Sequence, residues 1–218
     1  MGKREKRPAP VPQLSDIGAR IRQKLVAKDA AREQGIRACR EVIRYSAEAI
    51  RAMHRKEYEK AGSLLNSGKL RLEEAGRALA DYGDLANSGF IHDAQKEYAE
   101  GNITLALITG KPVPGPEAVG VSYASYLNGM GEAVGELRRF LLDSMRNGDL
   151  SPCERIFYDM DDIYDELIKM DFPDAITYGL RRTTDVVRGI LEKTRGDLTL
   201  AIIQREIGNN KLRQTDTK

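Results

Sequence analysis

SYLNGMGEAVGELRRFLLDSMRNGD, residues Ser125 to Asp149, is the most informative stretch of this 218-residue chain. Apolar side chains recur in it at steps of three or four: Met130, Val134, Leu137, Leu141 and Met145. That spacing gathers them on one face of an α-helix. Asn147-Gly148 then supplies a helix-ending signal. The stretch therefore predicts a long amphipathic helix, from about Val119 to Asn147, packed against other helices.

Helical patterns continue on both sides of this stretch. Upstream, the spacing predicts helices at about 15–60, 61–85 and 89–108, followed by a turn-rich loop. Downstream, Ser151-Pro152-Cys153-Glu154 matches a capping box that opens a helix, and Pro173 precedes a last element at 174–207. Without strand–helix alternation, the predicted fold is all-α. We expect a single-domain bundle of six or seven helices at 15–209, a disordered basic, proline-rich tail at 1–14, and a flexible C-terminus at 210–218.

Composition limits the class of protein. Hydrophobic residues make up 41% of the chain and charged residues 31%, and no apolar run approaches the roughly 20 residues that a membrane helix needs. The two cysteines, Cys39 and Cys153, fit no metal-ligand spacing. We therefore expect a soluble protein of a reduced, cytoplasmic compartment that does not enter a membrane.

A row of arginines follows one face of the first predicted helix. The row consists of Arg37, Arg40, Arg44, Arg51 and Arg55, spaced 3, 4, 7 and 4 residues apart. Residues 1–60 also carry 16 lysines and arginines against 8 acidic residues. Arginine forks suit phosphate oxygens, so such a row can follow a nucleic-acid backbone without reading sequence. The alternative that the residues leave open is an ordinary solvated face, with Glu41 and Glu48 as ion-pair partners.

Two pairs of carboxylates form the second candidate site. Glu97 and Glu100 stand three apart on the third predicted helix, and Glu132 and Glu136 stand four apart on the fourth. If the two helices are neighbours, four carboxylates converge, and such a cluster repels itself unless it binds a cation. Oxygen ligands favour Mg²⁺ or Mn²⁺, which can activate water for phosphodiester hydrolysis. Acids at this spacing are also common on solvated helices, so spacing alone leaves both interpretations open.

The sequence resembles the translin family. The resemblance rests on Tyr126-Leu127, Gly129, Gly135-Glu136-Leu137, Arg139 and Asn147-Gly148-Asp149, together with Lys96-Glu97-Tyr98-Ala99-Glu100, which looks like a segment of translin-associated factor X. It covers about residues 28–208. At Glu132 the animal proteins have Asp, so this chain departs from them by one methylene. The compact chain looks like an archaeal, homomeric version.

The resemblance implies an all-helical protein that assembles into a closed, octamer-like shell around RNA, single-stranded or a small duplex. It implies a Mg²⁺- or Mn²⁺-dependent endoribonuclease of the translin-associated factor X type. The catalytic and metal-binding residues would then be Glu97, Glu100, Glu132 and Glu136, with Arg37, Arg40, Arg44 and Arg51 as phosphate contacts. Two alternatives remain: a nucleic-acid-binding shell without hydrolysis, as in translin itself, and a structural subunit that is active only beside a different chain.

Overall fold

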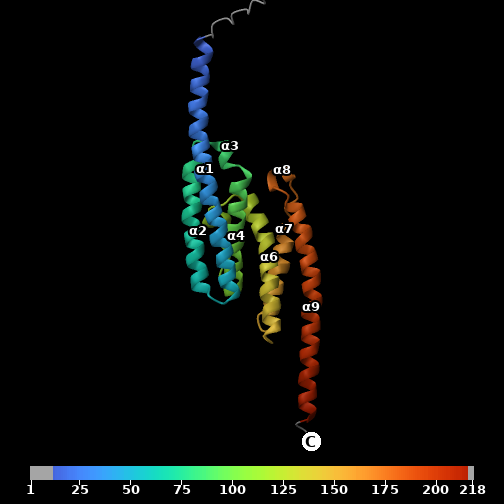
Figure 1. Ribbon diagram of the computed structural model, residues 1–218. Coiled ribbons are helices and arrows are strands. Elements are labelled where there is room, and N and C mark those ends of the chain that lie inside the picture. Colours follow the sequence, from blue (N-terminus) through green and yellow to red (C-terminus); the bar gives the residue numbers. More distant parts are fainter. Residues whose placement is uncertain (1–11, 216–218) are drawn as a thin grey trace, which may run out of the picture.

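The structure, a computed structural model, describes residues 12–215 and is helical throughout its regular elements (Figure 1). Six long helices carry the fold: α1 (Pro12–His54), α2 (Tyr58–Leu79), α4 (Gly89–Thr109), α6 (Tyr123–Arg146), α7 (Cys153–Leu167) and α9 (Leu180–Thr215). Three four-residue helices join them: α3 (Gly83–Ala86), α5 (Pro116–Val119) and α8 (Asp174–Thr177). Within residues 12–215, none of these helices has the length and apolar character to cross a membrane. The all-α bundle expected from the sequence is confirmed.

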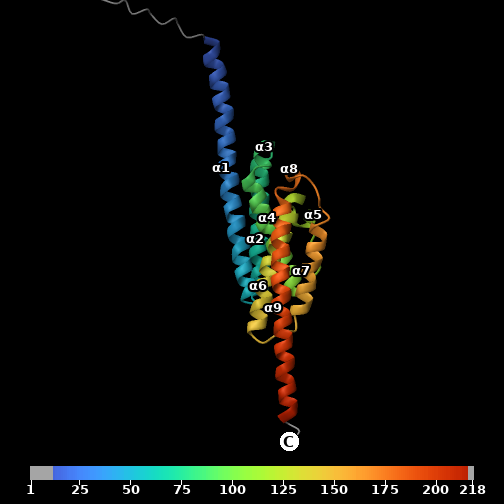
Figure 2. The same ribbon diagram turned by 90° about the vertical axis from the view of Figure 1, so that its right-hand side faces the viewer.

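The long helices form two groups that meet mainly along one contact. α1 packs against α2 and α4, whereas α6 packs against α7 and α9, and the α4–α6 contact joins the two groups. The first half of α1 extends beyond one end of the bundle, and the last part of α9 extends beyond the other end (Figures 1 and 2). The α4–α6 contact is therefore the centre of the fold.

The first helix differs from its predicted limits. It begins at Pro12, three residues before the predicted start, because proline fits the first turn of a helix, where its missing N–H has no intrahelical acceptor. It ends at His54, earlier than predicted, because Lys56 takes a left-handed backbone with φ 62°. The rest of the predicted N-terminal tail, residues 1–11, lies outside the described residues.

The later boundaries differ for similar reasons. Gly120, at φ 78°, separates α5 from α6, so the central helix begins at Tyr123 instead of Val119. The predicted capping box does not form: Pro152 occupies the N-cap position, and the Ser151 hydroxyl donates to Asp149 Oδ1 at 2.6 Å. A left-handed turn ending at Gly179 (φ 80°) divides the last predicted element into α8 and α9. The second of these continues to 215, past the predicted boundary at 209.

A glycine sets how closely α4 and α6 approach. A Cβ placed on Gly129 of α6 would lie 2.5 Å from the backbone oxygen of Lys96 and 2.9 Å from the Cβ of Ala99. Only a residue without a side chain allows this contact. Ile103 of α4 and Leu137 of α6 are fully buried on the same two helices. The helices that carry the predicted glutamates therefore pack against each other, as the metal-site prediction requires.

Candidate active site

Three of the four predicted glutamates come together at the α4–α6 contact. Glu97 and Glu100 project from α4 and Glu132 from α6, and one carboxylate oxygen from each lies within 4.8 Å of the other two. The two α4 residues share a face because they stand three positions apart. Glu100 is the deepest of them, with only 8% of its surface exposed. The close approach at Gly129 brings the α6 carboxylate to the α4 pair.

Burial and mutual repulsion make this cluster costly to ionise. Burial, followed by repulsion from Glu97 and Glu132, raises the pKa of Glu100 from 4.5 to about 8. Burial and the charge of Glu132 also raise the pKa of Glu97. In the described part of the chain, no side chain donates a hydrogen bond to either α4 carboxylate, whereas Glu132 has one donor. Ionisation of all three glutamates would therefore need additional positive charge close to them.

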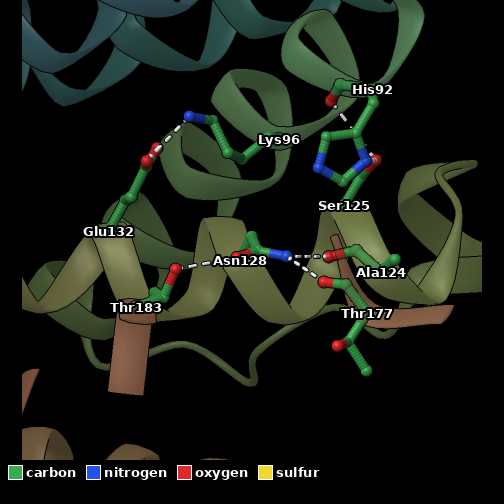
Figure 3. Close-up of polar contacts among 8 residues, drawn as sticks. All are labelled: His92, Lys96, Ala124, Ser125, Asn128, Glu132, Thr177 and Thr183. Atoms are coloured by element: carbon green, nitrogen blue, oxygen red, sulfur yellow. Dashed lines mark hydrogen bonds and ion pairs between the residues drawn. The ribbon is translucent and has the colours of Figure 1, made fainter. Parts of the chain in front are cut away.

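Lys96 supplies part of that charge. Its Nζ lies 2.7 Å from Oε1 of Glu132, across the α4–α6 contact (Figure 3). Burial opposes the charge on Lys96, but the hydrogen bond and the surrounding carboxylates prevail and raise its pKa. One ammonium thus faces three carboxyl groups, which is less positive charge than full ionisation of all three would need.

Glu136, the fourth predicted ligand, has a different partner. Its Oε2 accepts a hydrogen bond from Nε2 of His54, at the end of α1, over 2.6 Å. That hydrogen bond, with the attraction of Arg139, outweighs burial and lowers the pKa of Glu136. Glu136 still lies near enough to add to the repulsion on Glu97 and Glu100. The structure thus separates the predicted set into a cluster of three and a neighbour held by α1.

The glutamates open into a cavity of about 860 Å³ between α4, α6 and the start of α9. Sixteen residues line it, and among them are the three clustered glutamates, Lys96 and Arg182. Sequence reasoning missed Lys96 as part of the site and missed Arg182 altogether. Lys96 sits inside the Lys-Glu-Tyr-Ala-Glu segment, which could have indicated it, whereas Arg182 lies in a region without any motif.

Asn128 holds in place the start of α9, which forms one wall of the cavity. Its side-chain amide donates to the backbone oxygens of Ala124 (2.9 Å) and Thr177 (2.8 Å), and its Oδ1 accepts from Thr183 Oγ1 at 2.8 Å (Figure 3). The residue is buried, with 4% exposed. A buried amide whose donors and acceptor are all hydrogen-bonded makes the segments that it connects more rigid. Asn128 thereby ties the α8–α9 turn to the helix that carries Glu132.

The arginine row lies elsewhere. Arg37, Arg40, Arg44 and Arg51 are all exposed on α1, on the side away from its buried face, and α1 contributes no residue to the lining of the cavity. Arg44 pairs with Glu48 at 3.2 Å and lies 4.3 Å over the ring of Tyr45. The other three form no ion pair with the residues that the structure describes. The arginine row and the glutamates therefore occupy separate surfaces of one chain.

Known proteins share this architecture. The chain is 31% identical over 183 residues to an uncharacterized protein of Methanocaldococcus jannaschii, covering 82% of this chain and 79% of that protein. The solved structures of AfC3PO, alone and in complex with duplex RNA, are 31% identical, with a TM-score of 0.79 over 86% of this chain and 97% of theirs.

A more distant structure, apo-NeC3PO, shares the fold at a TM-score of 0.72 and 20% identity, over 89% of this chain and all of that one. No protein-family model matches the sequence. The similarity to AfC3PO extends over nearly the whole length of that protein. The chain therefore belongs to the C3PO family of translin-type proteins.

Proposed function

We propose that this chain is a metal-dependent endoribonuclease of the translin-associated factor X type, which hydrolyses RNA phosphodiesters inside a homo-oligomeric shell. The observation that carries the proposal is the convergence of Glu97, Glu100 and Glu132 within 4.8 Å in a cavity that also contains basic side chains. The similar protein AfC3PO forms a complex with duplex RNA, which supports RNA as the substrate class here.

The donor set fits a hard divalent cation. Three carboxylates within reach of one ion match the oxygen ligation that Mg²⁺ and Mn²⁺ prefer. Burial and repulsion raise the pKa of Glu100, and a bound ion would offset both and favour its ionised form. Glu136 stands next to the cluster, where it can hold a water of the ion's coordination shell while His54 orients its carboxylate.

When bound, the metal would polarise a phosphoryl oxygen and lower the pKa of a water molecule. The chain itself supplies the remaining functions. Lys96 reaches into the same space from α4 and can neutralise charge on the reacting phosphate. Glu136, whose lowered pKa keeps its carboxylate ionised beside the cluster, could accept the proton of an attacking water. Arg182 adds a cation on the opposite wall, suited to a neighbouring phosphate.

The exposed arginines provide a second, extended contact with the RNA backbone. Arg37, Arg40 and Arg51 project from α1 without ion-pair partners among the described residues. Contacts of this kind give affinity that depends on salt and not on base sequence. Assembly into a closed homo-octamer would bring several such helices around one RNA, which is the arrangement that we propose.

A test is incubation of the pure protein with labelled single-stranded RNA in the presence of Mn²⁺ and, separately, of EDTA. We expect cleavage only with metal, and we expect the double change Glu132→Ala and Glu136→Ala to abolish it while RNA binding persists. A matched control replaces two exposed acids away from the cavity, Glu166→Ala and Glu192→Ala, and should cleave normally. Metal-dependent cleavage by the first double variant would refute the proposal.

One observation favours a second candidate function, an RNA-holding shell without hydrolysis. Lys96 already pairs with Glu132 and partly neutralises the cluster without any ion. Under this alternative, the protein binds RNA equally in Mn²⁺ and EDTA and cleaves it in neither. Size-exclusion chromatography with light scattering would test the oligomeric shell in both cases.

A further inference from the structure

An aromatic pair stands at the mouth of the glutamate cavity. The rings of His92 and Tyr178 are stacked, with centroids 4.3 Å apart and planes inclined by 17°. Both residues line the cavity. Tyr178 is 50% exposed although one face of its ring is covered by His92, so the other face remains accessible. Within the described residues, no other side chain is stacked on this second face of the Tyr178 ring, which borders the same cavity as the glutamates.

The backbone presents Tyr178 at a cost. Its φ is 52°, a left-handed conformation that bulky residues rarely adopt. Asn128 holds the preceding residue, Thr177, by a 2.8 Å hydrogen bond, and thereby fixes the turn to α6 (Figure 3). The Tyr178 hydroxyl also donates to the backbone oxygen of Asn87 at 3.4 Å. A strained position that its surroundings hold in place is typical of functional sites.

His92 is an equally fixed support. Its Nδ1 is joined to Ser125 Oγ over 2.8 Å (Figure 3). Burial lowers the pKa of His92, which favours the uncharged ring. Together, the two rings form a rigid platform whose outer face is Tyr178.

The residues that support the platform lie about one helical turn from the charged residues of the cluster. On α6, Asn128 precedes Glu132 by four residues, and on α4, His92 precedes Lys96 by four. Each step is about one helical turn, roughly 5.4 Å along the axis. Arg182 is exposed in the first turn of α9 and forms no ion pair with any residue that the structure describes. An aromatic face, a cation and a carboxylate cluster thus line one cavity of about 860 Å³.

We propose that this cavity binds one unpaired nucleotide of an RNA strand, with its base stacked on Tyr178 and its phosphate on Arg182. This inference rests on the proposed function, since the neighbouring phosphodiester would then lie at Glu97, Glu100 and Glu132. Unpaired bases stack on aromatic side chains, whereas a base inside a duplex has both faces covered by its neighbours. Tyr178 therefore selects the strand position that is cleaved, by requiring that it be unpaired.

The test uses the full-length protein and a single-stranded oligoribonucleotide with one 2-aminopurine, whose fluorescence falls on stacking. In EDTA, binding should quench the fluorophore, and Tyr178→Asn should remove the quenching and weaken affinity about tenfold. Asparagine tolerates the left-handed backbone, so this variant keeps the fold, which an unchanged melting temperature verifies. Tyr178→Phe, which keeps the ring but loses the hydroxyl's hydrogen bond to Asn87, should retain most of the quenching. Tyr158→Asn, at another exposed tyrosine on α7, is the matched control.

A second substrate carries one abasic nucleotide in place of a base. With Mn²⁺, wild-type protein should cleave less at the position whose base is missing, and Tyr178→Asn should not distinguish the two substrates. Equal quenching by wild type and Tyr178→Asn, or equal use of the abasic substrate by wild type, would overturn the platform. Quenching without cleavage would instead support the platform and count against the nuclease, so the two proposals fail separately.

Discussion

Nε2 of His54 lies 2.6 Å from Oε2 of Glu136, and this hydrogen bond joins the end of the first helix to the glutamate-bearing face of α6. The two residues are 82 positions apart in the chain. The His54 side chain is 6% exposed and that of Glu136 25%, so the carboxylate depends on this donor more than on water. This hydrogen bond holds the Glu136 carboxylate in place beside Glu97, Glu100 and Glu132, the residues proposed to hold the metal.

We expect His54→Ala both to lower the stability of the protein and to weaken its affinity for Mn²⁺. Leaving a largely buried carboxylate without its donor costs about 1–3 kcal/mol, measurable by urea denaturation at pH 7. The lowered pKa of Glu136 contributes stability above its ordinary value of 4.5, and that part disappears as pH falls below it. His54→Gln, which retains a donor, should recover part of the stability and of the Mn²⁺ affinity. Arg139→Ala, which removes a more distant, exposed partner at 3.9 Å, should change little.

Glu100 gives a pH dependence of the opposite sign. Its pKa is raised from 4.5 to about 8 by burial and by its acidic neighbours. The unfolded chain therefore releases this proton at lower pH than the folded chain, and metal-free protein should become less stable as pH rises from 4.5 to 8. Glu100→Gln should remove this decline, which amounts to roughly 1.4 kcal/mol for each tenfold difference between the folded and unfolded acid constants. Thermal unfolding in EDTA at pH 5 and pH 8 measures it. Equal stability differences between variant and wild type at both pH values would contradict the assignment.

Gly129→Ala should separate the helices that build the cluster. The new Cβ would meet the Lys96 backbone oxygen at 2.5 Å, and backbone cannot move aside as a side chain can. Overpacking of this kind costs about 1–3 kcal/mol, and the displaced α6 should also reduce Mn²⁺ binding. Gly189→Ala is the matched control on α9, where an added methyl has nothing within 4 Å. That change should stabilise, by up to about 1 kcal/mol. A stable, metal-competent Gly129→Ala variant would disprove the role of this close approach.

The arginine row predicts the salt dependence of RNA binding. Replacing Arg37, Arg40 or Arg51 with Gln should lower the slope of log affinity against log salt by about 0.7 for each phosphate that the variant no longer neutralises. Arg44→Gln should have a smaller effect, because that guanidinium is already engaged by Glu48 and Tyr45. Titration of a labelled single strand at several salt concentrations distinguishes the two cases. An unchanged slope in all four variants would show that α1 faces away from the RNA.

Sequence periodicity predicts most of the helices, because the spacing of apolar residues within a segment indicates which face of the helix is buried. The apolar stripe through Leu137 and Leu141 predicted α6, and both side chains are fully buried. Helix boundaries do not follow from periodicity, because they depend on single backbone conformations. Lys56 and Gly120 end or divide helices through positive φ values, and only the folded chain shows which residues adopt them.

For the candidate site, too, one part follows from the sequence and the other from the tertiary structure. Helical spacing alone paired Glu97 with Glu100 and Glu132 with Glu136, since neighbours at three or four residues share a helix face. Only packing decided that Glu132 meets the α4 pair while Glu136 meets His54, because that choice depends on how α1, α4 and α6 are rotated about their axes. The platform of His92 and Tyr178 and the position of Arg182 are tertiary properties too. They bring α4 and the start of α9 together across more than 80 residues, a proximity that no local pattern encodes.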